Sequence, residues 1–386
     1  MQSYTRVIQA LLSQRGPGAE QQKAQAWDMF SHMRYVAHAT VDHFLYSVMI
    51  RACAESADPE PERALDLFTE MTVEKKIAPT THAYNAVILT CARSKRFALE
   101  AFRLAREMLN SHRDAHGEIP ARLRPDKNTF CALLEAAKRI GDLPRARWIL
   151  AQMTEIVNMG RESEPPVFID EKVMIHLFHA YAAYRPPFHR DAVTFVSEGE
   201  FVNQPTSEKQ GRDASQGQEV DAADIRRPRG APQSRQEVIK EASTIWKRIL
   251  EDSQNGRYAR DDPSEPYTTF GRVSLTTSLL NAYMTVHYAH SSPTASYKVY
   301  SNLFEQLGVP RDAFTYVFAL EAYAQCKRAT EPELRLRLSF ARDVWKSWQD
   351  LEVTGVAQMS DDSPNPNVDA RLVERAWSAM IKILAL

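Results

Sequence analysis

The stretch HAYNAVILTCARSKRFALEAFRLAREML, residues 82–109, decides the fold. Its apolar residues recur at helical spacing on both sides of the polar segment RSKR, which predicts two short amphipathic helices joined by a turn. In the first helix, Cys91 follows Tyr84 by seven residues. In the second, Ala101 precedes Met108 by seven. Two helices of this length bury little apolar surface by themselves, so we expect neighbouring segments of the chain to cover them.

The same spacing recurs before and after this stretch. The anchor, the residue four later and the residue seven later are Tyr4, Ile8 and Leu11; Tyr46, Ile50 and Cys53; Tyr84, Ile88 and Cys91; and Phe130, Leu134 and Ala137. An alanine lies seven residues before a methionine in each second helix, as Ala26–Met33, Ala64–Met71, Ala101–Met108 and Ala146–Met153. Seven residues are two helical turns, so both side chains share one face. Weaker copies begin at Met174, Thr276 and Tyr316, and Trp377 predicts the first helix of an eighth. We therefore predict an all-α array of about seven to eight helix-turn-helix repeats.

Composition limits the classes of function. The 386 residues include only 13 glycines, and the formal net charge is −1, so a strongly basic nucleic-acid-binding protein is not indicated. No apolar run is long enough to span a membrane. The four cysteines form no CxxC, and the histidine pairs 176/179 and 287/290 lack further ligands at metal-binding spacing. Since nucleophile-elbow, phosphate-loop and dinucleotide motifs are also missing, we predict no enzyme activity, no cofactor and no metal.

One segment departs from the repeat pattern. Residues 185–235 contain no leucine and are rich in Pro, Gln, Ser, Asp and Gly, which predicts a disordered insertion within the fifth repeat. The basic motif DIRRPRG at 224–230 lies inside it, and we interpret that motif as a solvated linker. The insertion separates residues 1–184, which hold repeats one to four and the first helix of repeat five, from residues 236–386, which hold the remainder up to a partial repeat eight.

The aligned repeats resemble the pentatricopeptide repeat (PPR) family. The resemblance rests on HAYNAVILTCARSKRFALEAFRLAREM, PDKNTFCALLEAAKRIGDLPRARWILAQM, FLYSVMIRACA with ERALDLFTEM, and RDAFTYVFALEAYAQC. It covers most of the chain outside 185–235 and is strongest in repeats two to four. The tetratricopeptide repeat is the nearest alternative, but its Trp, Leu-Gly and Tyr signature is absent. The resemblance implies a right-handed α-solenoid whose first helices line the concave face.

The resemblance also implies that each repeat contacts one base of single-stranded RNA through two side chains. One follows the aromatic anchor and the other closes the repeat. The implied RNA-binding pairs are Thr5 with Asp42, Ser47 with Thr80, Asn85 with Asp126, Cys131 with Asp170, and Thr277 with Asp312. In the family's code Asn with Asp prefers uracil and Thr with Asp prefers guanine. Repeats five (Ile175, Arg272) and seven (Val317, Val373) carry combinations outside that code.

Two functions remain open at this point. The resemblance implies an RNA-binding protein of the mitochondrial matrix that acts in transcript stability, processing or translation, with the mitochondrial ribosome or other proteins as further partners. Locally, residues 93–147 carry 13 Lys and Arg against 7 Asp and Glu, which suits RNA. The alternative is a protein-protein scaffold, such as an assembly factor for a mitochondrial complex. The near-zero net charge and repeats five and seven favour that alternative.

Overall fold

The computed structural model describes residues 2–14, 18–37, 42–54, 58–110, 123–159, 167–187, 230–258, 269–325, 331–357 and 370–385. Within these ranges the secondary structure consists of helices, and strands are absent. The predicted all-α fold class is therefore confirmed. Most of the predicted insertion at 185–235, including residues 224–229 of the motif DIRRPRG, lies outside the described residues.

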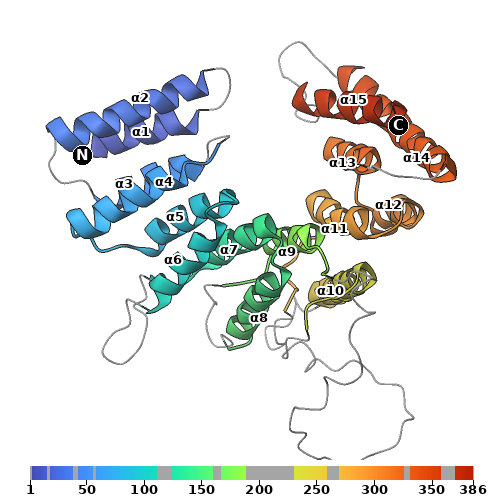
Figure 1. The fold of residues 1–386 in the computed structure, drawn as a ribbon, viewed down its shortest axis with the longest axis horizontal. Helices are drawn as coiled ribbons and strands as arrows, with labels where there is room; N and C mark the ends of the chain where they lie inside the picture. Colours follow the sequence, from blue (N-terminus) through green and yellow to red (C-terminus); the bar gives the residue numbers. More distant parts are fainter. Residues whose placement is uncertain are drawn as a thin grey trace, which may run out of the picture. The chain divides into compact units, whose positions relative to one another are not determined.

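Along the chain the helices alternate as the first and second helices of successive repeats (Figure 1). The first helices are α1 (Gln2–Ser13), α3 (His43–Ala54), α5 (Thr81–Arg93), α7 (Lys127–Ile140), α9 (Glu171–Ala183), α11 (Thr277–His290), α13 (Ala313–Ala324) and α15 (Ala370–Leu384). The second helices are α2 (Ala19–His32), α4 (Pro61–Thr69), α6 (Ala98–Asn110), α8 (Leu143–Met159), α10 (Arg235–Tyr258), α12 (Pro293–Leu307) and α14 (Glu331–Ala357). Helices α2 and α4 continue as π-helical turns, η1 (Met33–Ala37) and η2 (Glu70–Glu74).

The chain divides into two compact bodies. The N-terminal body comprises Met1–Ala183 together with Asp252–Ser274, and the C-terminal body comprises Tyr184–Glu251 together with Leu275–Leu386. The division falls inside repeat five, because α9 belongs to the first body and the greater part of α10 to the second. A short segment that follows α10 in the sequence therefore packs back on the N-terminal body.

Within each body, successive first helices pack side by side. Contacts link α3 to α5, α5 to α7 and α7 to α9 in the N-terminal body, and α11 to α13 and α13 to α15 in the C-terminal body. The second helices α4, α6, α8 and α14 each contact their own first helix and also the first helix of the next repeat. Each repeat thus completes the core of its neighbour, which answers why residues 82–109 can form two short helices.

The small-residue pattern of the second helices marks their buried face. All eight side chains of the four alanine–methionine pairs, Ala26, Met33, Ala64, Met71, Ala101, Met108, Ala146 and Met153, are 0% exposed. The alanine lets the helices of a hairpin approach closely, and the flexible methionine fills the space two turns later. Cys53 and Cys91 are also fully buried, and burial raises the pKa of their thiols to about 11 and about 12. The cysteines are therefore packing residues.

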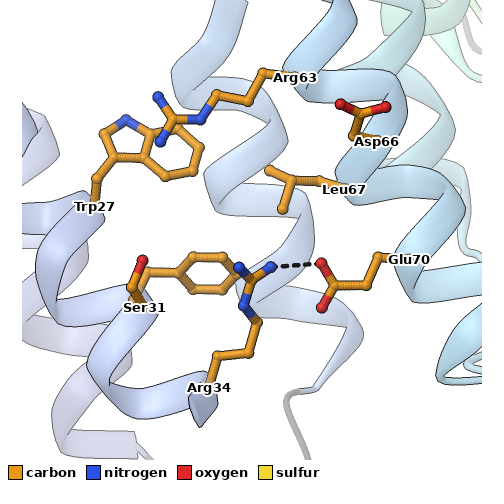
Figure 2. Close-up of a pocket in the computed structure, with 8 residues that line it drawn as sticks. Trp27, Ser31, Arg34, Arg63, Asp66, Leu67 and Glu70 are labelled. Atoms are coloured by element: carbon orange, nitrogen blue, oxygen red, sulfur yellow. Dashed lines mark hydrogen bonds and ion pairs between the residues drawn. The ribbon is translucent and has the colours of Figure 1, made fainter.

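Polar contacts between second helices join repeats one and two (Figure 2). Arg34 forms an ion pair with Glu70, and Glu70 also accepts a hydrogen bond from the Tyr46 hydroxyl at 2.8 Å. The Arg63 guanidinium lies 3.4 Å from the centroid of the Trp27 ring, a cation–π contact from α4 to α2. A cavity of about 210 Å³ lies among these side chains. This cavity is lined by second helices and the π-turns that continue them, so it is separate from the residues predicted to contact RNA.

Candidate nucleic-acid interface

One polar residue precedes each of six first helices and caps it. The side chain of each accepts a hydrogen bond from the backbone N–H three residues later. The six capping residues are Asp42 (from Leu45, 2.8 Å), Thr80 (Ala83, 3.4 Å), Asp126 (Thr129, 2.9 Å), Asp170 (Val173, 3.1 Å), Thr276 (Leu279, 3.3 Å) and Asp312 (Thr315, 2.8 Å). These bonds satisfy backbone donors that a helix start leaves open. Helix capping is therefore sufficient to explain an Asp or Thr at the end of each of these six repeats.

The capping residue of α7 also contacts the preceding repeat. Asn85 donates from Nδ2 to Oδ1 of Asp126 at 2.9 Å, and its own Oδ1 accepts from the Thr129 hydroxyl at 2.6 Å. Asp126 and Thr129 additionally form a reciprocal capping box. The structure thus brings together the predicted pair Asn85 and Asp126, and it fixes the orientation of the Asn85 amide from two sides. Asn85 is partly exposed.

A second pair of the same kind joins α11 to α13. Asn281 donates from Nδ2 to Oδ1 of Asp312 at 3.1 Å, and Asp312 forms a capping box with Thr315. Asn281 lies five residues after its capping residue Thr276, as Asn85 does after Thr80. Thr277, which the sequence paired with Asp312, is the first residue of α11, and its hydroxyl donates to the Pro310 carbonyl at 2.9 Å. The position equivalent to Asn85 is therefore Asn281, one turn later than Thr277.

Of the other residues five after a capping residue, all except Ile175 are buried. Ser47 is 8% exposed and donates to the His43 carbonyl at 2.8 Å on its own helix, while Cys131 is 6% and Val317 0% exposed. Ile175 is partly exposed. Thr5, in α1, is 8% exposed. Asn85 is thus the polar side chain of this set that is most open to a ligand.

The side chains two residues after each capping residue point to solvent. All six are exposed: Phe44, His82, Asn128, Lys172, Ser278 and Phe314. Residues two and five after a cap are three apart, so they lie on the same side of a helix. We name these six the second-position residues. Counting from the aromatic anchor does not identify these residues, whereas counting from the capping residue does.

Charge gathers at the start of α7 and α9. Lys127 donates to Asp170 at 2.7 Å, and Lys172 is exposed. Burial raises the pKa of the Cys131 thiol to about 11; Lys172 and Lys127 act to lower this pKa, and Asp170 acts to raise it. Cys131, the predicted partner of Asp170, is thus a buried thiol that stays protonated at neutral pH.

The closing residues predicted for repeats five and seven do not cap a helix. Thr276 caps α11, and Arg272 lies four residues before it, with its Cζ atom 5.2 Å from the centroid of the Phe168 ring. Val373 lies inside α15, which begins at Ala370. Neither repeat has a Pro-Asp dipeptide, such as Pro125–Asp126, to mark the start of the next first helix.

Other kinds of site find no support in the part of the chain that the structure describes. No group of three or more His, Cys, Asp or Glu residues there could hold a metal ion. Among the described helices, none combines the length and apolar character that crossing a membrane requires.

Comparison with known proteins gives two kinds of similarity. No family model matches the chain. Over 160 residues it is 28% identical to the mitochondrial 15S rRNA processing factor CCM1 of Yarrowia lipolytica (strain CLIB 122 / E 150), a match that covers 41% of this chain and 18% of that protein. The chain therefore spans less than a fifth of the length of this curated relative.

Among solved structures, the pentatricopeptide repeat protein PPR10 in complex with an 18-nt psaJ RNA element aligns with the whole chain and with 51% of its own length. The TM-score is 0.34 and the identity 16%, and a cysteine-substituted form of PPR10 with the same RNA element gives the same values. Two features of this chain can be compared with such proteins: its repeated sequence pattern and its succession of helical hairpins. In both respects the chain is similar to pentatricopeptide repeat proteins.

Proposed function

We propose that the protein binds single-stranded RNA along the starts of its first helices and acts in mitochondrial RNA metabolism. The observation that carries the proposal is the contact between Asn85, Asp126 and Thr129, which holds a partly exposed amide in one orientation. An amide fixed in this way has one N–H and one carbonyl lone pair left to meet a base edge. The N3–H and a carbonyl of uracil match that donor and acceptor.

The second-position residues supply the other half of a base-binding surface. Phe44 is 49% and Phe314 45% exposed, although both are large apolar side chains. An exposed aromatic ring beside polar groups is suited to stack on an unpaired base, and such stacking contributes roughly 1–3 kcal/mol per base. His82, Asn128 and Lys172 occupy the same row and can contact a base or a phosphate.

The proposed compartment and process rest on similarity. The Yarrowia lipolytica relative is a mitochondrial 15S rRNA processing factor. We infer a role in the mitochondrial matrix, in transcript processing, stability or translation, through occupancy of the RNA rather than through catalysis. The mitochondrial ribosome is a further partner on this proposal.

Replacing Asp126 with serine tests the proposal at one base. Serine caps a helix about as well as aspartate, so the stability of α7 is expected to change by less than about 0.5 kcal/mol. The Asn85 amide, however, loses its carboxylate partner, and we expect the preference at that base to move from uracil toward cytosine. The measurement is sequencing of the RNA that the purified protein selects from a randomised single-stranded pool, beside a urea titration.

Two controls separate recognition from folding. Asp126→Ala removes both the cap and the contact with Asn85, and it is expected to cost about 1 kcal/mol of stability. Asp312→Ser makes the same exchange in the second pair, where Asn281 loses its carboxylate partner. Absence of RNA binding by the wild-type protein at low salt would refute the proposal, whereas binding with an unchanged base preference in Asp126→Ser would remove only this pair from base recognition.

Repeats five and seven favour a second candidate function, a protein-interaction scaffold. Ile175 and Val317 take the place of Asn85 there and offer no hydrogen bond to a base. A protein that co-purifies with the full chain from mitochondria and stays bound after ribonuclease treatment would support the scaffold. Loss of every partner on ribonuclease treatment would exclude it.

A further inference from the structure

Repeats four and seven share a polar contact between neighbouring first helices. In repeat four, Oε2 of Glu135 in α7 lies 3.4 Å from Nδ1 of His176 in α9. In repeat seven, Glu321 in α13 accepts two hydrogen bonds from Arg375 in α15, one from Nε at 2.8 Å and one from Nη2 at 3.0 Å. In both cases the acid is the ninth residue of its helix and the base is the sixth residue of the next first helix. The two pairs therefore occupy equivalent positions in their repeats.

Both repeats lack a polar, exposed side chain at the position of Asn85. Cys131 takes that position in repeat four and is 6% exposed, while Val317 takes it in repeat seven and is 0% exposed. The acid lies four residues later, about one helical turn along the same face. In repeat seven the side chains of Arg375 and Glu321 are 40% and 34% exposed, whereas the carboxylate side chain of repeat four is 9% exposed. The pair of repeat seven is thus the one that a ligand can reach.

Two phenylalanine rings lie beside the pair of repeat seven. The Arg375 Cζ atom is 5.6 Å from the centroid of the Phe318 ring, within the range of a cation–π contact. The Phe318 ring is in turn 6.0 Å from the Phe314 ring, with an angle of 45° between their planes. Phe314 is 45% exposed and Phe318 is partly exposed. An unpaired base that stacks on these rings brings its edge toward the Arg375 guanidinium.

Glu321 leaves one edge of the Arg375 guanidinium free. The carboxylate occupies the edge formed by Nε and Nη2, and within the described part of the chain Arg375 donates to no other residue. One N–H of Nη1 and one of Nη2 then point the same way, a fork that matches two adjacent acceptors. Guanine presents such acceptors at O6 and N7, and cytosine presents them at N3 and O2. Adenine and uracil instead alternate acceptors and donors along their edges.

The local charge favours a base over a phosphate as the ligand. Three positive and three negative side chains lie just before α13, on α13 and in the first two turns of α15: Arg311, Asp312, Glu321, Arg371, Glu374 and Arg375. A phosphate would meet no excess of positive charge there. Hydrogen bonds to the edge of a neutral base require none, and the exposed rings supply a stacking surface that a phosphate cannot use.

From these contacts we infer that repeat seven binds a guanine or a cytosine of single-stranded RNA. The base stacks on Phe314, and Arg375 donates to two adjacent acceptors on its edge. Glu321 is a positioning residue, because it fixes the plane of the guanidinium through two hydrogen bonds. The inference rests on the proposed function and gives a base contact to a repeat in which Val317 offers none.

The first test compares the RNA that each purified variant selects from a randomised single-stranded pool. Arg375→Met keeps the apolar stem but removes the fork, so enrichment of guanine or cytosine is expected to disappear at one position and to persist at the others. Arg375→Lys keeps a cation for Glu321 without the fork, so it is expected to select as Arg375→Met does, and it replaces that variant if Arg375→Met does not fold. The control Lys382→Met removes the same charge from an exposed site near the end of α15 and is expected to match the wild type.

The second test measures the affinity for the RNA that the wild-type protein selects. Placing adenine at the affected position is expected to weaken wild-type binding roughly fivefold or more, and to weaken binding by Arg375→Met less than about twofold. If the ion pair only stabilised the fold, Arg375→Met would unfold at lower urea and keep the wild-type base preference; that result would overturn the inference while the proposed function stands. A wild-type pool with no position enriched in guanine or cytosine would overturn it equally. If the wild-type protein binds no RNA at low salt, the proposed function fails and this inference fails with it.

Discussion

Lowering the pH from about 7 to about 4 is expected to destabilise each body by roughly 3 kcal/mol through one histidine. Burial lowers the pKa of His179, in the N-terminal body, and of His287, in the C-terminal body, from 6.5 to about 4. Above pH 6.5 both folded and unfolded states are neutral at these residues. Below it the unfolded chain binds protons that the folded chain excludes, so stability falls until the folded histidines also titrate.

The measurement is a series of urea titrations at constant salt between these pH values. His287→Leu is the control, because it removes the titrating group from the C-terminal body and leaves the N-terminal body unchanged. The variant is expected to abolish the pH dependence of one of the two unfolding transitions. A C-terminal transition that keeps its full pH dependence in His287→Leu would contradict the assignment.

Glu135 extends the loss of stability to lower pH. The carboxylate is 7% exposed; burial acts to raise its pKa, but His176 and Lys138 outweigh burial and hold the pKa well below its usual value. His176 approaches at 3.4 Å between Nδ1 and Oε2, a distance of an ion pair rather than of a well-aligned hydrogen bond. Since the folded pKa is lowered, the stabilising contribution is complete above the unfolded pKa of 4.5 and declines as the pH falls toward the folded value.

Replacing Trp348 with alanine is expected to have the largest effect of any single substitution considered. Trp348 is 0% exposed in α14, and truncation of a fully buried tryptophan costs about 3–5 kcal/mol through lost burial and the cavity that remains. The loss should appear in the unfolding transition of the C-terminal body and leave that of the N-terminal body in place. Urea titration followed by circular dichroism measures it.

Trp348→Phe distinguishes packing from hydrogen bonding. Among the residues that the structure describes, no group accepts a hydrogen bond from the buried indole N–H of Trp348. Phenylalanine keeps most of the ring and removes that unpaired donor, so its cost is expected to stay below about 1.5 kcal/mol. If Trp348→Phe were as destabilising as Trp348→Ala, the loss would come from a hydrogen bond of the indole N–H and not from packing, and the prediction would be wrong.

The repeats and their buried face could be predicted from the sequence because the buried residues recur at the same spacing in successive repeats. Each of the first four hairpins buries an alanine and a methionine at the same spacing, and these four copies identify the buried face. The contact between Asn85 and Asp126 was also predictable, because Tyr84 and the Pro-Asp at 125–126 mark both ends of that repeat. Whether these residues bind RNA stays a prediction.

Repeat six shows where the aromatic anchor fails. Leu280, not an aromatic residue, takes the place of Tyr84 there, so counting from Thr276 as an anchor moved the register by one turn. The capping hydrogen bond is the better marker, since every first helix needs one whatever its core residues are. The contact of Arg272 with Phe168 could not be predicted, because it joins two irregular segments separated by the insertion and no periodic pattern relates them.

Helix capping also restricts which substitutions the closing residues of the repeats can tolerate. A residue that closes one repeat and starts the next can change only within the small alphabet of side chains that cap well, namely Asp, Asn, Ser and Thr. Exchanges inside that alphabet alter the donor or acceptor offered to a base at little cost in folding, and all other exchanges weaken a helix. At Asn85 no such restriction applies. Sequence variation among such repeats should therefore be narrow at the capping residues and broader at a partly exposed position such as Asn85.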